Sequence, residues 1–262
     1  MSSNIFDLSN KTVVITGASS GFGHHFAGVL ADAGASVVLA ARRKEKIQKR
    51  AEEIITKGGK AIALELDVND ADAVKLFLDE AEDYGSGIDI LINNAGVEAG
   101  AKTFMMIDEE DWDYVFNTNL KSVWRLSKLF TERVANARAI NRDRTASIIN
   151  IASITAFRTI KGQFPYAVSK AALVKATEVM ALEGAKFGVR VNALAPGYFL
   201  TDVSRILLES EMSESFRQGI PMRRFGEFSD LDGPIMLLAS DASSYMTGST
   251  IVVDGGHICS EL

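Results

Sequence analysis

Short apolar runs rich in Val and Ile alternate along this chain with longer stretches in which apolar residues recur every three or four positions. The short runs predict buried strands, and the longer stretches predict helices. The predicted strands cover residues 12–16, 36–40, 61–66, 88–92, 147–151, 190–195 and 250–253. The predicted helices cover residues 20–33, 43–57, 70–84, 108–137, 165–187 and 229–240.

Strands that are apolar on both faces and separated by helices are typical of a parallel sheet with helices on each side. Right-handed crossovers then predict an α/β fold with a doubly wound, Rossmann-type sheet of about seven strands. No linker or break in composition divides residues 1–262, so we expect a single domain. The least regular stretch, about 197–227, follows a strand, and we expect it to form a substrate lid at the carboxyl edge of the sheet.

The composition is that of an ordinary globular protein. Of the 262 residues, 47% are apolar and 24% are charged, which argues against intrinsic disorder. The 28 Lys and Arg against 34 Asp and Glu give a net charge of −6 without a basic block, so we expect no nucleic-acid partner. No apolar run approaches the roughly 18 residues that a membrane span needs, so we expect no membrane association.

Cysteine and histidine are rare in this sequence. The single cysteine, Cys259, cannot form an internal disulfide, which suits a reducing compartment. His24, His25 and His257 do not have the spacing of metal ligands, so we expect no metal site. Residues 1–7 lack the basic and apolar segments of a signal peptide, and we therefore expect a cytoplasmic protein.

A glycine-rich turn follows the first predicted strand and begins the first predicted helix. Glycines let the backbone approach a pyrophosphate closely, and the free N–H groups of a helix N-terminus attract its charge. The alternative, a tight turn without a ligand, is less favoured at this place in an alternating chain. The residues that we expect to hold a dinucleotide here are Gly17, Ser19, Ser20, Gly21, Phe22 and Gly23.

The end of the second predicted strand bears on the choice of dinucleotide. An acidic residue there would bind the adenosine 2′-hydroxyl of NAD, whereas an arginine suits the 2′-phosphate of NADP. The strand ends with Ala41 and Arg42, so no carboxylate repels a phosphate and a guanidinium can bind it. We expect a preference for NADP(H). If Arg42 and Arg43 merely begin a solvated helix, NAD(H) remains acceptable.

Four polar side chains are expected to meet near this turn. Tyr166 and Lys170 lie four positions apart on one helical face, and Ser153 follows the carboxyl end of a strand. Asn119 lies within an apolar helical stretch, and residues 93–96 end another strand at the same edge of the sheet. Each residue alone could serve packing or solubility, but the set together favours a catalytic site.

With these motifs, the chain resembles the short-chain dehydrogenase/reductase family over nearly its whole length. The matching motifs are Thr16-Gly-x-x-x-Gly-x-Gly23, Asp67-Val68, Asn93-Asn-Ala-Gly96, Asn119, Ser153, Tyr166-x-x-x-Lys170, Pro196-Gly197 and Val253-Asp254-Gly255-Gly256. The resemblance implies that further residues contact the cofactor: Asp67 and Val68 at the adenine, Thr201 at the nicotinamide carboxamide, and Asn94, Ala95, Gly96, Pro196, Gly197, Tyr166 and Lys170. Relatives that use NADP often carry a basic residue at the position of Ser20, and its absence here leaves the 2′-phosphate mainly to Arg42, with help from the Ser19 or Ser20 hydroxyl.

The residue types predict how hydride transfer is completed. Reduction of a ketone leaves an alkoxide, to which the Tyr166 phenol can give a proton. We expect the Lys170 ammonium to lower the pKa of Tyr166 and the Ser153 hydroxyl to bind the carbonyl oxygen. The resemblance adds that Lys170 holds the nicotinamide ribose and that Asn119 anchors a water that relays protons.

The predicted activity is the NADP(H)-dependent interconversion of a ketone and a secondary alcohol. A 3-oxoacyl thioester of an acyl carrier protein or coenzyme A is a candidate small-molecule substrate, and a sugar, polyol or steroid alcohol remains open. A non-catalytic NADP sensor is less favoured because the catalytic set is complete. The resemblance also implies a homotetramer or dimer through helices 108–137 and 165–187, with the candidate contacts Phe130, Val134, Leu173, Val179 and Met180.

Overall fold

The computed structural model describes residues 4–85, 87–200 and 213–260. Seven strands form one parallel sheet in the order β3-β2-β1-β4-β5-β6-β7. The strands are β1 (Thr12–Thr16), β2 (Ser36–Ala41), β3 (Lys60–Glu65), β4 (Ile90–Asn93), β5 (Ala146–Ile151), β6 (Val189–Pro196) and β7 (Thr250–Val253). The predicted doubly wound sheet is confirmed. Its order reverses between β1 and β4, the kind of switch point at which ligands bind in such sheets.

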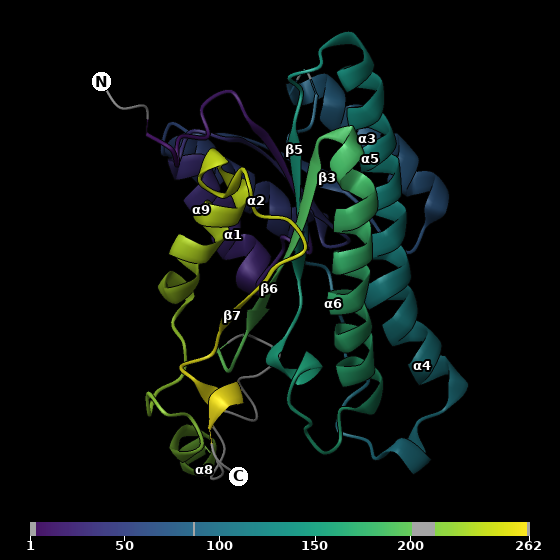
Figure 1. The fold of residues 1–262 in the computed structure, drawn as a ribbon, viewed down its shortest axis with the longest axis vertical. Helices are drawn as coiled ribbons and strands as arrows, with labels where there is room; N and C mark the ends of the chain where they lie inside the picture. The colour runs from purple at the N-terminus through teal and green to yellow at the C-terminus, as the bar shows by residue number, and fades with distance from the viewer. Residues whose placement is uncertain (1–3, 86, 201–212, 261–262) are drawn as a thin grey trace.

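Helices cover both faces of the sheet because successive side chains of each strand point to opposite faces. Val13 and Ile15 pack into one core with α1, α2 and α9, whereas Val14 packs into a second core with α3, α5 and α6. Figure 1 shows these two groups of helices on opposite sides of the sheet. The helices are α1 (Gly21–Asp32), α2 (Lys44–Thr56), α3 (Ala71–Gly85), α4 (Glu109–Phe116), α5 (Ser122–Ile140), α6 (Phe164–Gly184), α8 (Ser213–Gln218) and α9 (Asp232–Ala239).

The helix predicted over 108–137 is present, but its middle has an unexpected geometry. A π-helical turn, η2 (Asn117–Lys121), joins α4 to α5 without a break. The Ser122 hydroxyl donates to the Thr118 carbonyl at 2.6 Å, next to this wider turn. Asn119 lies in the turn and is fully buried. A π turn inserted into an α-helix often marks a functional site.

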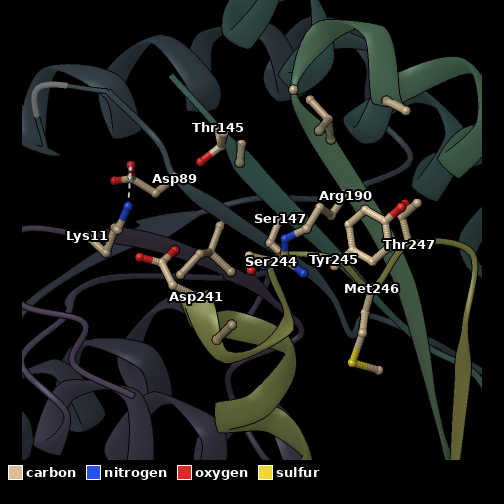
Figure 2. Close-up of a pocket in the computed structure, with 16 residues that line it drawn as sticks. Lys11, Asp89, Thr145, Ser147, Arg190, Asp241, Ser244, Tyr245, Met246 and Thr247 are labelled. Carbon is tan, nitrogen blue, oxygen red and sulfur yellow. Dashed lines mark ion pairs between the residues drawn. The ribbon is translucent and has the colours of Figure 1, made fainter. Parts of the chain in front are cut away.

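The amino-terminal edge of the sheet holds charged side chains in mutual pairs. A cavity of about 440 Å³ lies there. Figure 2 shows Lys11 directed toward Asp89 on one side of its lining. Asp89 is 6% exposed and accepts hydrogen bonds from the Thr12 backbone N–H at 2.8 Å and from Arg144 at 2.5 Å. None of the predicted site residues lines this cavity. The structural role of this edge is to tie β1, β4 and β5 together, and the candidate chemistry lies at the opposite edge.

The stretch expected to form a lid, 197–227, lies at that opposite edge and is described in part. Residues 201–212 fall outside the described ranges, so the lid stays a prediction. On its described flanks, the rings of Tyr198 and Phe216 lie 5.3 Å apart, and the backbone of Phe199 pairs with that of Gly226. Across the described residues, no helix has the length and apolar character needed to cross a membrane.

Candidate active site

The turn after β1 and the loop after β4 are hydrogen-bonded to each other at the switch point. The Asn94 side-chain amide donates to the carbonyls of Thr16 and Gly17, at 2.9 and 3.1 Å. In return, the Thr16 hydroxyl accepts from the backbone N–H groups of Asn94 and Ala95. Gly17 has a φ of +66°, and a Cβ there would lie 2.8 Å from the Ala95 Cα. The turn therefore requires glycine at this position.

The start of α1 has room for a phosphate. Gly21 begins the helix, and a Cβ on it would meet no atom within 4 Å. The preceding residue, Ser20, has an extended backbone, and its side chain does not cap the helix. The N–H groups of a first helical turn have no helical partners and attract anions. The residues present here therefore fit the pyrophosphate of a dinucleotide.

Arg43, which the sequence analysis did not assign to the site, reaches this turn. Its guanidinium donates to the hydroxyls of Ser19 and Ser20, each at 2.8 Å. Arg42 is exposed, and in the described part of the chain it has no hydrogen bond or ion pair. A pair of adjacent arginines after β2 was the available signal, and their side-chain directions decided which one contacts the turn.

Asp67 and Val68 follow the carboxyl end of β3, next to β2. The Asp67 carboxylate accepts from the backbone N–H of Asn69 at 2.9 Å. Val68 is buried, and its carbonyl accepts from Arg125 at 3.3 Å. These contacts hold the segment on the side of the switch point where the resemblance implies an adenine.

Ser153, Tyr166 and Lys170 come together from two elements. Ser153 follows β5 and begins a 3₁₀ turn, η3 (Ile154–Ala156), while the other two lie one turn apart on α6. The Ser153 side chain lies close enough to the Tyr166 phenol to lower its pKa in part. The Lys170 ammonium donates to the Ile151 carbonyl at 2.7 Å and lies 5.6 Å from the centre of the Tyr166 ring. The structure thus places the phenol between a hydroxyl and an amine.

Asn119 lies next to this group, and both polar atoms of its side-chain amide are bonded to other protein groups. Its Oδ1 accepts from the Val97 backbone N–H at 2.8 Å, and its Nδ2 donates to the Val97 carbonyl at 2.9 Å. The same Nδ2 donates to the Ser169 hydroxyl at 3.0 Å. The side chain therefore positions the loop after β4, and the expected water relay stays a prediction.

The remaining predicted residues differ in how far the structure describes them. A Cβ on Gly96 would lie 3.6 Å from the Lys170 Nζ, so the loop after β4 passes directly over the amine. Gly197 follows Pro196, the last residue of β6, and a Cβ on Gly197 would lie 2.7 Å from the Asp254 Cβ. Thr201 lies outside the described residues.

Comparison with known proteins identifies the family of this chain. A family model described as "Enoyl-(Acyl carrier protein) reductase" matches residues 17–257. A solved short-chain type dehydrogenase/reductase from Mycobacterium marinum is 36% identical, with a TM-score of 0.91 and 98% of each chain covered. The chain belongs to the short-chain dehydrogenase/reductase family. It is therefore an oxidoreductase that acts on a CH–OH group with NAD(P).

Two further relatives of this short-chain dehydrogenase/reductase differ in their substrates. A 3-oxoacyl-[acyl-carrier-protein] reductase of Staphylococcus epidermidis is 36% identical over 248 residues, covering 94% of this chain and 98% of the relative. A solved gluconate 5-dehydrogenase from Burkholderia cenocepacia, in complex with NADP and tartrate, is 31% identical with a TM-score of 0.92. That match covers 98% of this chain and 99% of the solved one. In the described part of the chain, no group of three or more His, Cys, Asp or Glu side chains could hold a metal.

Burial shifts the pKa values of Tyr166 and Lys170, the two site residues on α6. It raises the pKa of Tyr166 to about 12, the Ser153 side chain lowers it in part, and the Glu98 charge raises it further. Burial also lowers the pKa of Lys170 to about 8. We expected Lys170 to lower the pKa of Tyr166, but the loss of water around the phenol outweighs any such effect. The phenol is thereby kept protonated at neutral pH.

Glu98 is a residue of the site that the sequence analysis missed. It lies two positions after Gly96, and its charge is close enough to Tyr166 to raise the pKa of the phenol. Burial raises the pKa of the Glu98 carboxyl as well. Its position directly after the Asn93–Gly96 motif was a signal that could have identified it.

The lowered pKa of Lys170 predicts a pH-dependent stability. Between about pH 8 and 10.5 the unfolded lysine holds a proton that the folded lysine has released, so the free energy of unfolding rises with pH there. We expect the wild type to gain up to about 3 kcal/mol relative to Lys170→Met over this range. Urea denaturation at several pH values measures the difference.

Lys175→Met is the matched control, because Lys175 lies on the same helix with a side chain that is 73% exposed. Its free energy of unfolding should follow that of the wild type at every pH. Parallel curves for the wild type and Lys170→Met would contradict a lowered pKa.

Proposed function

We propose that this protein is an NADP(H)-dependent oxidoreductase that interconverts a ketone and a secondary alcohol. The observation that carries the proposal is that Ser153, Tyr166 and Lys170 meet in one place. The Lys170 Nζ lies 5.6 Å from the centre of the Tyr166 ring, and Ser153 lowers the pKa of the phenol in part. We also propose that the chain acts as one NAD(P)-binding domain, since one sheet runs from β1 to β7. The free Cys259 is consistent with the reducing cytoplasm that the sequence predicts.

When bound, the dinucleotide supplies or accepts the hydride. The Ser153 hydroxyl orients the substrate oxygen, and the Tyr166 phenol gives it a proton in the reductive direction. A phenol with a raised pKa is well suited to this task, because it stays protonated until an alkoxide forms beside it. In the oxidative direction the same residue, as phenolate, takes the proton of the alcohol. Lys170 holds the nicotinamide ribose in this proposal.

The preference for NADP(H) rests on the positive charge at the Gly-rich turn. Arg43 lies against Ser19 and Ser20, and Arg42 is exposed beside it with no acid at Ala41. A planar guanidinium donates strong hydrogen bonds to a phosphate. The two arginines and the Ser20 hydroxyl would therefore bind the 2′-phosphate. The NADP bound in the gluconate 5-dehydrogenase supports this assignment.

Two chemical classes of substrate are candidates for this site. Similarity to the 3-oxoacyl-[acyl-carrier-protein] reductase supports a 3-oxoacyl thioester, as the sequence analysis expected. Similarity to the gluconate 5-dehydrogenase, together with the Glu98 carboxylate whose charge acts on Tyr166, favours a hydroxylated substrate as the second candidate. The test is an assay in which each class of ketone is offered with NADPH and the loss of NADPH absorbance is measured.

We expect Tyr166→Phe to bind NADPH with the affinity of the wild type while kcat falls at least about 100-fold, the usual contribution of a positioned acid. Tyr245→Phe is the control, because Tyr245 is fully exposed and lies at the amino-terminal edge. Steady-state kinetics and cofactor fluorescence measure the two quantities. Near-normal turnover of Tyr166→Phe would remove this residue from proton transfer.

For the cofactor, we expect kcat/KM with NADPH to exceed that with NADH. Arg42→Ala and Arg43→Ala should each lower kcat/KM for NADPH about 10-fold or more and leave that for NADH unchanged, since each removes a charge-assisted bond to the 2′-phosphate. Lys60→Ala, at an exposed lysine where β3 begins, is the control. Equal efficiency with both cofactors in the wild type would overturn the assignment.

We propose a homotetramer or dimer assembled through α5 and α6. Phe130, Val134 and Leu173 are buried inside the chain, so these three expected contacts serve internal packing. The same helices expose Trp124 and Leu182, at 54% and 81%. Large exposed apolar side chains support an interface between copies.

Light scattering should therefore give a mass above that of one chain. Leu182→Glu should shift the protein to a smaller species, because a charge would be buried at the interface. Leu76→Glu, a change at an exposed leucine of α3, should leave the mass unchanged. A monomeric wild type would contradict the proposed assembly.

A further inference from the structure

The loop after β4 brings an acidic side chain, that of Glu98, to the catalytic cluster. Both the N–H and the carbonyl of Val97 are bonded to the Asn119 amide, at 2.8 and 2.9 Å. One residue earlier, the Gly96 backbone lies against the Lys170 amine. Glu98 therefore follows a backbone held on both sides, at the end of a loop that passes over Lys170, and its charge acts on the Tyr166 phenol.

The Glu98 carboxylate has lost part of its water without gaining a partner in the described part of the chain. Its side chain is half-buried, and among the described residues no group donates a hydrogen bond to it or pairs with it. Two basic side chains of neighbouring loops are bonded elsewhere, Lys102 to Asp111 and Arg158 to the His257 carbonyl. Carboxylates in folded proteins are normally hydrogen-bonded once they are buried.

A carboxylate that no described side chain pairs with, and whose charge acts on the proton donor, affects whichever substrate binds there. An apolar acyl chain would remove the remaining water from the carboxylate and offer no donor in exchange, which disfavours binding. A hydroxyl on the carbon next to the reacting one would replace that water with a hydrogen bond. Sites that bind a substrate hydroxyl in this way discriminate strongly against analogues that lack it.

We propose that Glu98 is a specificity-determining residue that accepts a hydrogen bond from a substrate hydroxyl adjacent to the reacting carbon. The substrate is then a hydroxyketone and its product a polyol. This inference rests on the proposed reduction of ketones. For this site it favours a hydroxylated ketone as substrate over a 3-oxoacyl thioester.

Three ketones of nearly equal size test the proposal: hydroxyacetone, butan-2-one and aminoacetone. The measured quantity is the ratio of kcat/KM for hydroxyacetone to that for butan-2-one, with NADPH and the full-length protein. We expect a ratio well above one in the wild type. Glu98→Leu should lower it at least about 10-fold, the effect of losing a hydrogen bond to a charged group. Glu98→Gln, which keeps a neutral acceptor of the same shape, should give an intermediate ratio.

Glu80→Gln is the matched control, because Glu80 is exposed on α3, and it should keep the wild-type ratio. NADPH affinity and thermal melting of each variant establish that the fold is retained. A ratio near one in the wild type, or a ratio that Glu98→Leu leaves unchanged, would overturn the proposal.

Other outcomes separate this inference from the function it rests on. A preference for aminoacetone that Glu98→Gln abolishes would show recognition of a cation and would also overturn it. Reduction of butan-2-one or ethyl acetoacetate without reduction of hydroxyacetone would contradict the proposed role of Glu98 and would still agree with the proposed reduction of ketones. Failure to reduce any of these ketones, with Tyr166→Phe behaving as the wild type, would count against the proposed function itself.

Discussion

The loop after β4 has no regular secondary structure, and two side-chain amides supply the hydrogen bonds that its backbone lacks. Asn94 joins the loop to the turn after β1, and Asn119 holds both polar groups of Val97. Backbone groups away from water need partners, so an irregular segment can cross a protein interior only where side chains provide them. The place for a pyrophosphate lies on one side of this loop, and the Tyr166–Lys170 pair lies on the other. Both depend on these two amides.

The helix that supplies Asn119 is adapted to the same task. A π turn at Asn117–Lys121 widens the helix where the amide faces the loop, and the amide is fully buried. Such turns are less favourable than regular α-helix and persist where surrounding contacts compensate. Burial of Tyr166 and Lys170 likewise opposes charge on both groups. The site thus gives up stability to hold a protonated phenol next to an amine, a common pattern at functional positions.

The strands and the glycine turn could be predicted because their signals are local. Val13, Val14 and Ile15 are apolar on both faces of a strand, and Gly17 must adopt a positive φ wherever this turn forms. The direction of a long side chain has no local signal. Arg43 rather than Arg42 contacts Ser19, and nothing in the neighbouring residues distinguishes the two arginines. The sequence analysis predicted a lowered pKa for Tyr166, and this prediction was wrong for a related reason. The direction of the shift depends on how many groups from distant segments exclude water from the phenol.

From the sequence alone followed the succession of strands and helices along the chain, the glycine turn, and the meeting of Ser153, Tyr166 and Lys170 at the carboxyl edge. Periodicity and residue type suffice for these because they reflect preferences of the chain over a few neighbours. The tertiary structure alone decided that Asn119 bonds a loop 22 positions away, that the charge of Glu98 acts on Tyr166, and that burial of the phenol outweighs the nearby amine. Each of these depends on distances between segments that are far apart along the chain, and on the water that their packing excludes.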